Sequence, residues 1–194
     1  MYTAQQTNDG FRFTDTESRM ETVSVPSGGT ITIKREQFGP IFQTKITLDN
    51  VTQAVVNGTE YQSTKLMTFP EGRLFVLGTT ATLRQKTTSA LASTLNASST
   101  GAIGLGTAAA SATTLATTMV DLLPSTAFTS SATINVAGTA VSAALASAAQ
   151  FDGTSTAKSM YLNTAYATTT DVDADATQTI SGTITVTWVW LGDY

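Results

Sequence analysis

The sequence predicts an all-β protein: an antiparallel β-sandwich of jelly-roll type, preceded by an extended N-terminal arm. Composition is the first observation behind this prediction. Charged residues make up only 12% of the chain, about half of the usual share, and threonine, serine, alanine and glycine take their place. A chain with so little charge and so many β-branched residues is typical of a folded β-protein rather than a disordered one. Alternation and turn signals are the other two observations.

The clearest strand signal lies in residues 179–191. Even-numbered positions are apolar and odd-numbered positions are mostly threonine, which is the period of two expected for a strand with one buried face. The buried face is predicted to form the centre of the core, with these members: Ile180, Ile184, Val186, Trp188 and Trp190. Val189 and Leu191 then make both faces apolar, so this end of the strand is predicted to be covered on both sides.

Turn signals separate further strands in the first half of the chain. Two alternating runs, 22–25 and 30–35, flank a Pro-Ser-Gly-Gly spacer and are expected to form a hairpin. Asn57-Gly58 follows the run 51–56, and an Asn-Gly pair is the strongest short-range hairpin signal. About ten candidate strands at irregular short spacing, without a convincing amphipathic helix, favour a sandwich or a jelly roll.

The middle of the chain, residues 87–150, is nearly all Ala, Ser, Thr, Gly and Leu. Alanine favours helices, but the alanine stretches lack caps and the surrounding threonines favour strands. We therefore expect short strands of small residues here. Nothing marks a linker, so residues 21–194 are predicted to form a single β-sandwich domain.

Residues 1–20 differ from the rest because they are polar and have no sustained period. Phe11 and Phe13 are their isolated apolar residues. Such a segment cannot bury enough surface of its own to offset its chain entropy. We expect it to be an extended arm that lies against a neighbouring subunit, with Phe11 and Phe13 as the candidate partner-binding residues.

The sequence predicts neither an enzyme nor a cofactor or metal site. It contains no histidine and no cysteine, which excludes Ser-His-Asp and thiol catalysis and the usual zinc ligands. Ser155 and Lys158 have the S-x-x-K spacing of serine acyl-transferases, but the companion motifs are missing and the match is expected by chance. Asp171, Asp173 and Asp175 lack the glycine and the final acidic ligand of a calcium loop.

The distribution of charge argues against nucleic acid as a partner. Residues 1–86 carry nine basic and eight acidic side chains, whereas residues 87–194 carry one basic and six acidic side chains. Affinity for phosphate needs clustered lysine and arginine, which the second half lacks. No apolar run approaches the roughly 20 residues of a membrane span, and the polar start shows no signal peptide, so synthesis in a cytoplasm is expected.

Several sequence blocks resemble, in order and spacing, a family of small virion proteins of tailed bacteriophages, including phages of cyanobacteria and marine bacteria. These are the capsid decoration, or cement, proteins. The resemblance spans residues 38–194 or so, and its most specific part is the C-terminal block. The blocks are Phe38-Gly39-Pro40, Thr68-Phe69-Pro70-Glu71-Gly72, Asp121–Ser125, Phe151–Thr154, Ala157-Lys158, Tyr161-Leu162-Asn163, Ile184–Trp188 and Leu191–Tyr194.

This resemblance implies a structural protein made in the bacterial host cytoplasm and placed on the outer surface of the virion capsid. Its partners would be the major capsid protein and other copies of itself, most often in a trimer, and the family has no catalytic motif. The alternative is a virion adhesin or fibre head whose exposed aromatic side chains bind host glycan. Tyr161, Tyr166 and Tyr194 are the candidates for that role. Many copies per virion would favour decoration, and a few would favour an adhesin.

Overall fold

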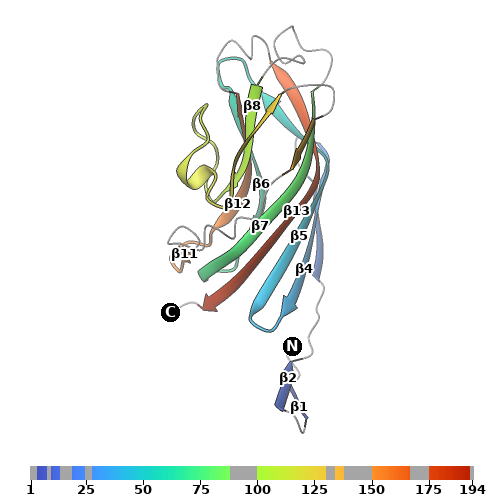
Figure 1. The fold of residues 1–194 in the computed structure, drawn as a ribbon, viewed down its shortest axis with the longest axis vertical. Coiled ribbons are helices and arrows are strands. Elements are labelled where there is room, and N and C mark those ends of the chain that lie inside the picture. Colours follow the sequence, from blue (N-terminus) through green and yellow to red (C-terminus); the bar gives the residue numbers. More distant parts are fainter. Residues whose placement is uncertain are drawn as a thin grey trace.

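The computed structural model describes residues 4–7, 10–13, 19–24, 28–87, 100–129, 134–137, 150–166 and 175–192. From residue 19 onward, the described residues form two packed antiparallel sheets (Figure 1). The long sheet has the strand order β10 (Ile134–Ala137), β7 (Gly72–Thr87), β13 (Ala176–Gly192), β5 (Ile41–Val55), β4 (Thr30–Phe38) and β3 (Arg19–Ser24), and β11 (Gln150–Gly153) also pairs with β7. The short sheet has the order β6 (Tyr61–Thr68), β12 (Ser159–Tyr166), β8 (Thr100–Gly106) and β9 (Leu123–Thr129).

The strand order is that of a jelly roll. Four strands of the long sheet, in the order β10-β7-β13-β5, face the order β6-β12-β8-β9, and every pairing is antiparallel. This is the eight-stranded, double-Greek-key arrangement. β3 and β4 extend the long sheet beyond β5, and β11 is an extra strand before β12. The predicted all-β sandwich is confirmed.

The core lies between the sheets, and β13 runs through its middle. Ile180, Ile184, Val186 and Trp188 are fully buried on its inward face. The threonines of the opposite face are half-buried. From Ile180 to Trp188, the alternation in the sequence therefore correctly predicts which side chains of β13 face the core.

Trp188 is the largest fully buried side chain of the core. Its ring stacks on Phe42, with ring centroids 4.5 Å apart, and meets Phe69 edge-on at 5.4 Å. The guanidinium of Arg35 lies 5.5 Å from the ring centroid. The indole nitrogen donates a hydrogen bond to Thr44 Oγ1 at 3.0 Å, so the polar atom of this buried side chain has a partner.

Trp190 corrects the prediction that the whole inward face of β13 is buried, because 45% of its surface is exposed. β13 has 17 residues, whereas β6 and β12 have eight each, so the long sheet extends past the short one. The Trp190 indole instead lies over the turn before β7 and donates to the Glu71 carbonyl oxygen at 2.9 Å. Gly72 permits this approach, since a Cβ at that position would lie 2.5 Å from the indole nitrogen.

The Asn57-Gly58 turn does not lead into the hairpin that the sequence predicts. Val56 and Thr59 form an isolated bridge, with Thr59 N donating to Val56 O at 2.8 Å. Beyond this bridge β5 joins the long sheet and β6 joins the short sheet. The turn signal is therefore correct, but the two strands separate because each completes a different sheet. The predicted pairing across the Pro-Ser-Gly-Gly spacer is present between β3 and β4.

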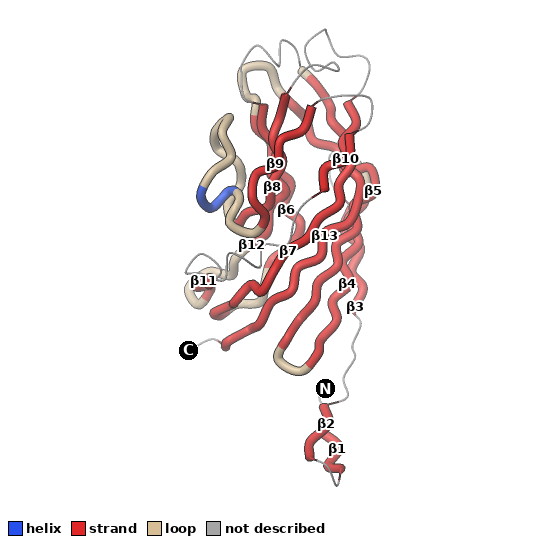
Figure 2. The backbone as a smooth tube through the Cα atoms, viewed as in Figure 1, coloured by secondary structure: helices blue, strands red, loops and turns tan. Residues whose placement is uncertain are grey.

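A loop of residues 107–122 covers the outward face of the short sheet and contains a single turn of 3-10 helix, Thr117–Met119 (Figure 2). Asn163 of β12 holds the loop, since its amide donates to the carbonyl oxygens of Ala108 (2.8 Å) and Met119 (2.7 Å). Its side-chain oxygen accepts from Ala110 N at 3.0 Å. Both faces of β12 are buried for this reason.

Asp121 closes the same loop at its base. Its carboxylate accepts hydrogen bonds from Thr107 N (2.8 Å) and Thr107 Oγ1 (2.6 Å). Burial nevertheless raises the pKa of Asp121 above its ordinary value, because loss of hydration outweighs the hydrogen bonds from Thr107. Asp152, which is exposed in β11, shows the opposite shift: hydrogen bonds from Thr154 lower its pKa.

The predicted N-terminal arm contains two short strands, β1 (Ala4–Thr7) and β2 (Gly10–Phe13), which pair with each other as a separate two-stranded sheet. The described part of the arm is therefore a hairpin rather than a single extended segment. β3 begins at Arg19, two residues before the predicted start of the sandwich domain. In the middle of the chain, β8, β9 and β10 are the short strands observed, and residues 88–99, 130–133 and 138–149 lie outside the described residues.

Candidate interaction surface

The outer face of the long sheet, which points away from the short sheet, carries an apolar row at the end formed by the β4–β5 turn. Strand register places Phe38 of β4 opposite Ile41 of β5, Ile41 opposite Val189 of β13, and Val189 opposite Phe75 of β7. All four have the parity that faces away from the core, since their neighbours Phe42 and Trp188 point inward. We call Phe38, Ile41, Val189 and Phe75 the apolar row.

The apolar row is accessible in the described part of the chain. Phe38 is 56% exposed, and Ile41, Val189 and Phe75 are half-buried without belonging to the core cluster. Leu191, the extra residue where the register shifts between Trp190 and Gly192, is 43% exposed. The prediction that this end of β13 is covered on both sides is therefore wrong for the described residues. A row of large apolar side chains on four adjacent strands is the kind of exposed patch that marks an interaction site.

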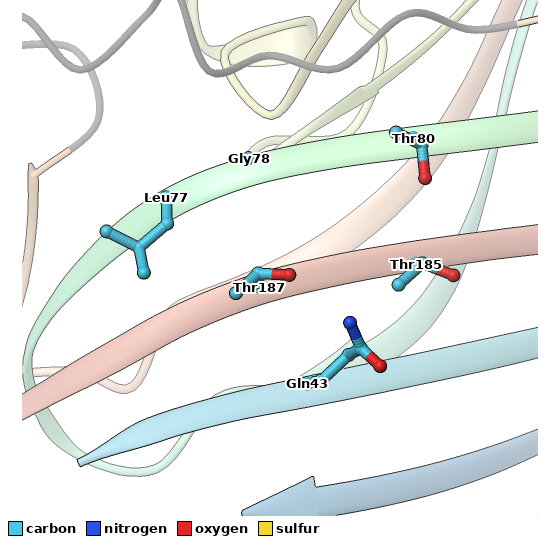
Figure 3. Close-up of a pocket in the computed structure, with 6 residues that line it drawn as sticks. All are labelled: Gln43, Leu77, Gly78, Thr80, Thr185 and Thr187. Carbon is cyan, nitrogen blue, oxygen red and sulfur yellow. The ribbon is translucent and has the colours of Figure 1, made fainter. Parts of the chain in front are cut away.

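A hollow of about 380 Å³ lies on the outer face next to the apolar row (Figure 3). It results from a β-bulge in β7: Thr187 lies opposite Gly78 and Trp188 opposite Val76, so Leu77 is an extra residue. Gly78 contributes no side chain, which leaves the space open. The hollow is lined by Gln43, Leu77, Gly78, Thr80, Thr185 and Thr187.

Beyond the hollow, threonines cover the outer face of the long sheet, and we call the row given next the threonine field. Thr32, Thr47, Thr183 and Thr82 lie opposite one another on β4, β5, β13 and β7, and Thr22 of β3 occupies the next place in the row. Their small, weakly hydrated side chains allow another surface to approach closely. Lys34 and Lys45 form the next row toward the β4–β5 turn, and Lys34 pairs with Glu36 at 2.6 Å.

The chemistry of this surface is suited to protein contact. The apolar row and Leu77 would gain from burial, at about 25 cal/mol for each Å² of apolar surface removed from water. The hollow could accept one large side chain, with Leu77 as its apolar wall and threonine hydroxyls at its rim. An apolar centre with a polar surround is the usual arrangement of a protein–protein interface.

The residues proposed from sequence for partner binding have mixed outcomes. Phe11 and Phe13 lie in β2 at register positions opposite Gln6 and Ala4, and their side chains lie outside what the structure describes. Tyr166 is not available for glycan binding, because it is buried and its hydroxyl donates to Gln178 Oε1 at 2.9 Å. Tyr161 is half-buried, and Tyr194 lies outside the described residues.

The structure describes part of the two sequence motifs that resemble a catalytic site and a calcium site. Ser155–Lys158 lies between β11 and β12 as bends and irregular backbone, not as the helix that an S-x-x-K site requires. Asp171 and Asp173 lie outside the described residues, while Asp175 Oδ1 accepts a hydrogen bond from Asn57 N at 2.9 Å. Within the described ranges, no group of three acidic, histidine or cysteine side chains is placed to hold a metal ion. None of the helical residues described forms a segment long and apolar enough to cross a membrane.

Of the apolar row, the sequence pattern singles out only Val189. The signal that could have found the rest was the pair Phe38 and Ile41, which flank the Gly39-Pro40 turn with the parity of the polar face. Phe75 carries the same signal, because Leu74 and Val76 on either side of it are buried. Apolar residues on the solvent-facing parity of three strands predict a covered face only when the register between the strands is known.

The fold places the chain among jelly-roll domains, an architecture shared by capsid, lectin and cupin proteins, so it does not by itself select a function. No family model matches the sequence, and no curated protein matches it either. Among solved structures, a chain of the "Structure of infectious bursal disease virus Gx strain" is similar, with a TM-score of 0.38 and 11% sequence identity. The alignment covers 88% of this chain and 43% of that one, so this protein spans less than half the length of its neighbour. The resemblance to phage decoration proteins stays a prediction from the sequence blocks.

Proposed function

We propose that this protein is a non-enzymatic structural component of a virion, which binds the outer surface of a tailed-phage capsid and stabilises the shell. The observation that carries the proposal is the outer face of the long sheet. It ends in the apolar row and a hollow that no described element covers. A sandwich with such a face is built to bind another protein surface.

The proposed stabilising role follows from the coupling between binding of this protein and assembly of the shell. A protein that binds the assembled shell but not its separated subunits stabilises the assembly by mass action, without any chemistry. The partners proposed are the major capsid protein and further copies of this chain, in a trimer that fits a three-fold position on the shell. The low surface charge and the threonine field support close contact between such subunits.

Adding the purified protein back to capsids that lack it tests this proposal. We expect saturation at hundreds of copies per capsid and a higher melting temperature of the shell in calorimetry. Val189→Thr with Phe75→Thr should weaken retention, because both substitutions keep β propensity but remove apolar contact. Val56→Thr is the matched control, since Val56 is also exposed (46%) but lies outside the apolar row. Saturation at a few copies, with no thermal shift, would reject a decoration role.

A virion adhesin is the second candidate, and the lining of the hollow favours it. The Gln43 amide and the hydroxyls of Thr80, Thr185 and Thr187 are groups that could hydrogen-bond to sugar hydroxyls. Binding of the protein to host cells or to a glycan array, lost in Gln43→Leu with Thr185→Val, would support this candidate. Retention on capsids with no glycan binding would favour decoration.

A further inference from the structure

We infer that the outer face of the long sheet binds an extended acidic segment of a different protein. Its side chains, taken two positions apart, would be apolar, apolar and acidic, in either chain direction. This partner is the capsid protein of the proposed function, on which the inference rests. Lys45 of β5 is the first reason for it. Lys45 is exposed, and no acidic side chain pairs with it in the described part of the chain.

Two positive charges lie side by side on this face. Lys34 and Lys45 are directly opposite each other on β4 and β5, and like charges in such positions destabilise a sheet. Glu36 neutralises one of them, since its carboxylate lies 2.6 Å from Lys34 Nζ. The three side chains together keep one positive charge. An anionic group from a partner would pair with this charge and relieve the remaining repulsion.

Lys45 lies at the edge of the hollow. Register puts it opposite Thr185, which lines the hollow, and Gln43, another lining residue, is two positions away on the same strand. Adjacent strands are about 5 Å apart and alternate residues about 7 Å apart, so the flexible lysine stem reaches the rim. None of the lining residues is acidic, and the Gln43 amide and the threonine hydroxyls are hydrogen-bond donors (Figure 3). The rim is therefore suited to a carboxylate.

Three binding positions follow one another along β13 at the spacing of an extended chain. Val189 belongs to the apolar row, Thr187 lies at the hollow with its Leu77 wall, and Thr185 lies beside Lys45. Successive positions are two residues apart on one face, which is about 7 Å. A partner strand presents alternate side chains at the same interval, and sheets packed face to face keep their strand directions within about 30°. Its side chains would meet two apolar positions and then a basic one.

A second copy of this chain is a poor source of the acidic segment. Most acidic side chains that the structure describes already have partners within their own molecule: Glu36 with Lys34, Asp49 with Asn50, Asp121 with Thr107, Asp152 with Thr154 and Asp175 with Asn57. Glu60 is buried. Glu71 is exposed, but Phe69, two positions before it, is buried, and Arg73, two positions after it, is basic. The described part of the chain therefore favours a different protein as the partner.

Charge variants test the basic position, using capsids that lack the protein. We expect Lys45→Glu to weaken retention about tenfold or more at low salt, because attraction at the interface becomes repulsion. Lys45→Arg keeps the charge and should bind like wild type. Lys65→Glu is the matched control, since Lys65 is exposed on β6 of the short sheet. Urea denaturation separates binding from folding: the midpoint of Lys45→Glu should be no lower than that of wild type, because the opposed lysine pair is gone.

Carbodiimide crosslinking of the wild-type complex with capsids identifies the occupant, because this reagent joins a lysine amine to a carboxylate in direct contact. Mass spectrometry should find Lys45 linked to an acidic residue of the capsid protein that has apolar residues two and four positions away on one side. A link from Lys45 to another copy of this chain, a link to a capsid segment without that pattern, or no link at Lys45 would overturn the inference.

Retention of the wild-type protein distinguishes failure of this inference from failure of the proposed function. If wild type binds capsids and Lys45→Glu binds as tightly as Lys65→Glu, the capsid role stands and the acidic segment is wrong. If wild type does not bind capsids, the capsid role fails and the inference fails with it.

Discussion

Gln178 donates a hydrogen bond from its side-chain nitrogen to the side-chain oxygen of Gln53, 2.8 Å away, and both glutamines are buried between the two sheets. The same nitrogen donates to Thr164 Oγ1 at 2.6 Å. Gln178 Oε1 accepts from Gln85 Nε2 (2.6 Å) and from the Tyr166 hydroxyl (2.9 Å). Gln178 thereby links β5, β7 and β13 of the long sheet to β12 of the short sheet.

Replacement of Gln178 by methionine tests the energetic weight of this network. Methionine fills a similar volume but leaves the donors of Gln85 and Tyr166 without their shared acceptor. Because buried groups that lose their partners cost about 1–3 kcal/mol each, we expect the free energy of unfolding to fall by about 3 kcal/mol. Urea denaturation measures it. Gln43→Met, on the outer face, is the control and should change stability by less than about 0.5 kcal/mol. Equal losses in the two variants would contradict a special role for the network.

Thr44 and Thr79 give a second prediction, because they are a matched pair with opposite expected effects. Both are fully buried, and both lie opposite Val186, on β5 and β7 respectively. Thr44 Oγ1 accepts the Trp188 indole hydrogen bond, whereas Thr79 Oγ1 has no hydrogen-bond partner in the structure described. Thr44→Val should lower stability by about 2 kcal/mol, and Thr79→Val should raise it by about 1 kcal/mol.

Chemical denaturation of both variants under the same conditions distinguishes the two effects. The volume change is nearly the same, so the difference reports the hydroxyl and its partner rather than packing. If Thr79→Val lost as much stability as Thr44→Val, then the Thr79 hydroxyl would have a partner that stabilises the fold, and the prediction would be wrong.

The facing of β13 could be predicted from sequence, but the extent of its burial could not. A period of two assigns each residue to one face of the strand. It does not say how far the opposing sheet extends, and for this reason the pattern predicts a buried Trp190 although the side chain is 45% exposed. The buried glutamines carry a signal in the sequence: Gln178 has the parity of Ile180, and Gln53 has the parity of Val51 and Val55. A polar residue on the apolar parity indicates a buried hydrogen-bond network when a second one can meet it.

The candidate site was harder to predict than the fold, because it depends on register between distant strands. Phe38, Ile41, Val189 and Phe75 come from four strands spread over most of the chain. Each one alone reads as an ordinary strand residue. The hollow depends on the bulge at Leu77, which no local pattern announces, since Leu77 continues an apolar run.

The two tryptophans give a third prediction, which fluorescence can test. Trp188 is fully buried and Trp190 is 45% exposed. In Trp190→Phe, the remaining emission should be blue-shifted and its quenching constant with acrylamide several-fold smaller than in Trp188→Phe. Because Trp188→Phe also removes a core contact, far-ultraviolet circular dichroism must show that this variant is folded. Similar quenching constants in two folded variants would contradict the assigned burial.

The last prediction concerns pH and rests on Asp121. Burial raises the pKa of Asp121 above its ordinary value of 3.8, so between 3.8 and the raised pKa the folded protein holds a proton that the unfolded chain has released. Stability must therefore fall as pH rises through this window. In Asp121→Asn, the side chain keeps an oxygen for Thr107 N but cannot ionise. We expect wild type to lose stability relative to Asp121→Asn as pH rises from 3.8 through the raised pKa, as measured by urea denaturation at a series of acidic pH values.

Asp152→Asn is the matched control, because the sign of its effect is opposite. Hydrogen bonds from the Thr154 hydroxyl and backbone lower the pKa of Asp152 below 3.8, so its contribution to stability is present above 3.8 and is lost as pH falls through the lowered pKa. Wild type should therefore gain on Asp152→Asn as pH rises, while it loses on Asp121→Asn. The two difference curves should slope in opposite directions over the acidic range. Parallel slopes would show that burial of Asp121 at the base of the 107–122 loop does not control its ionisation.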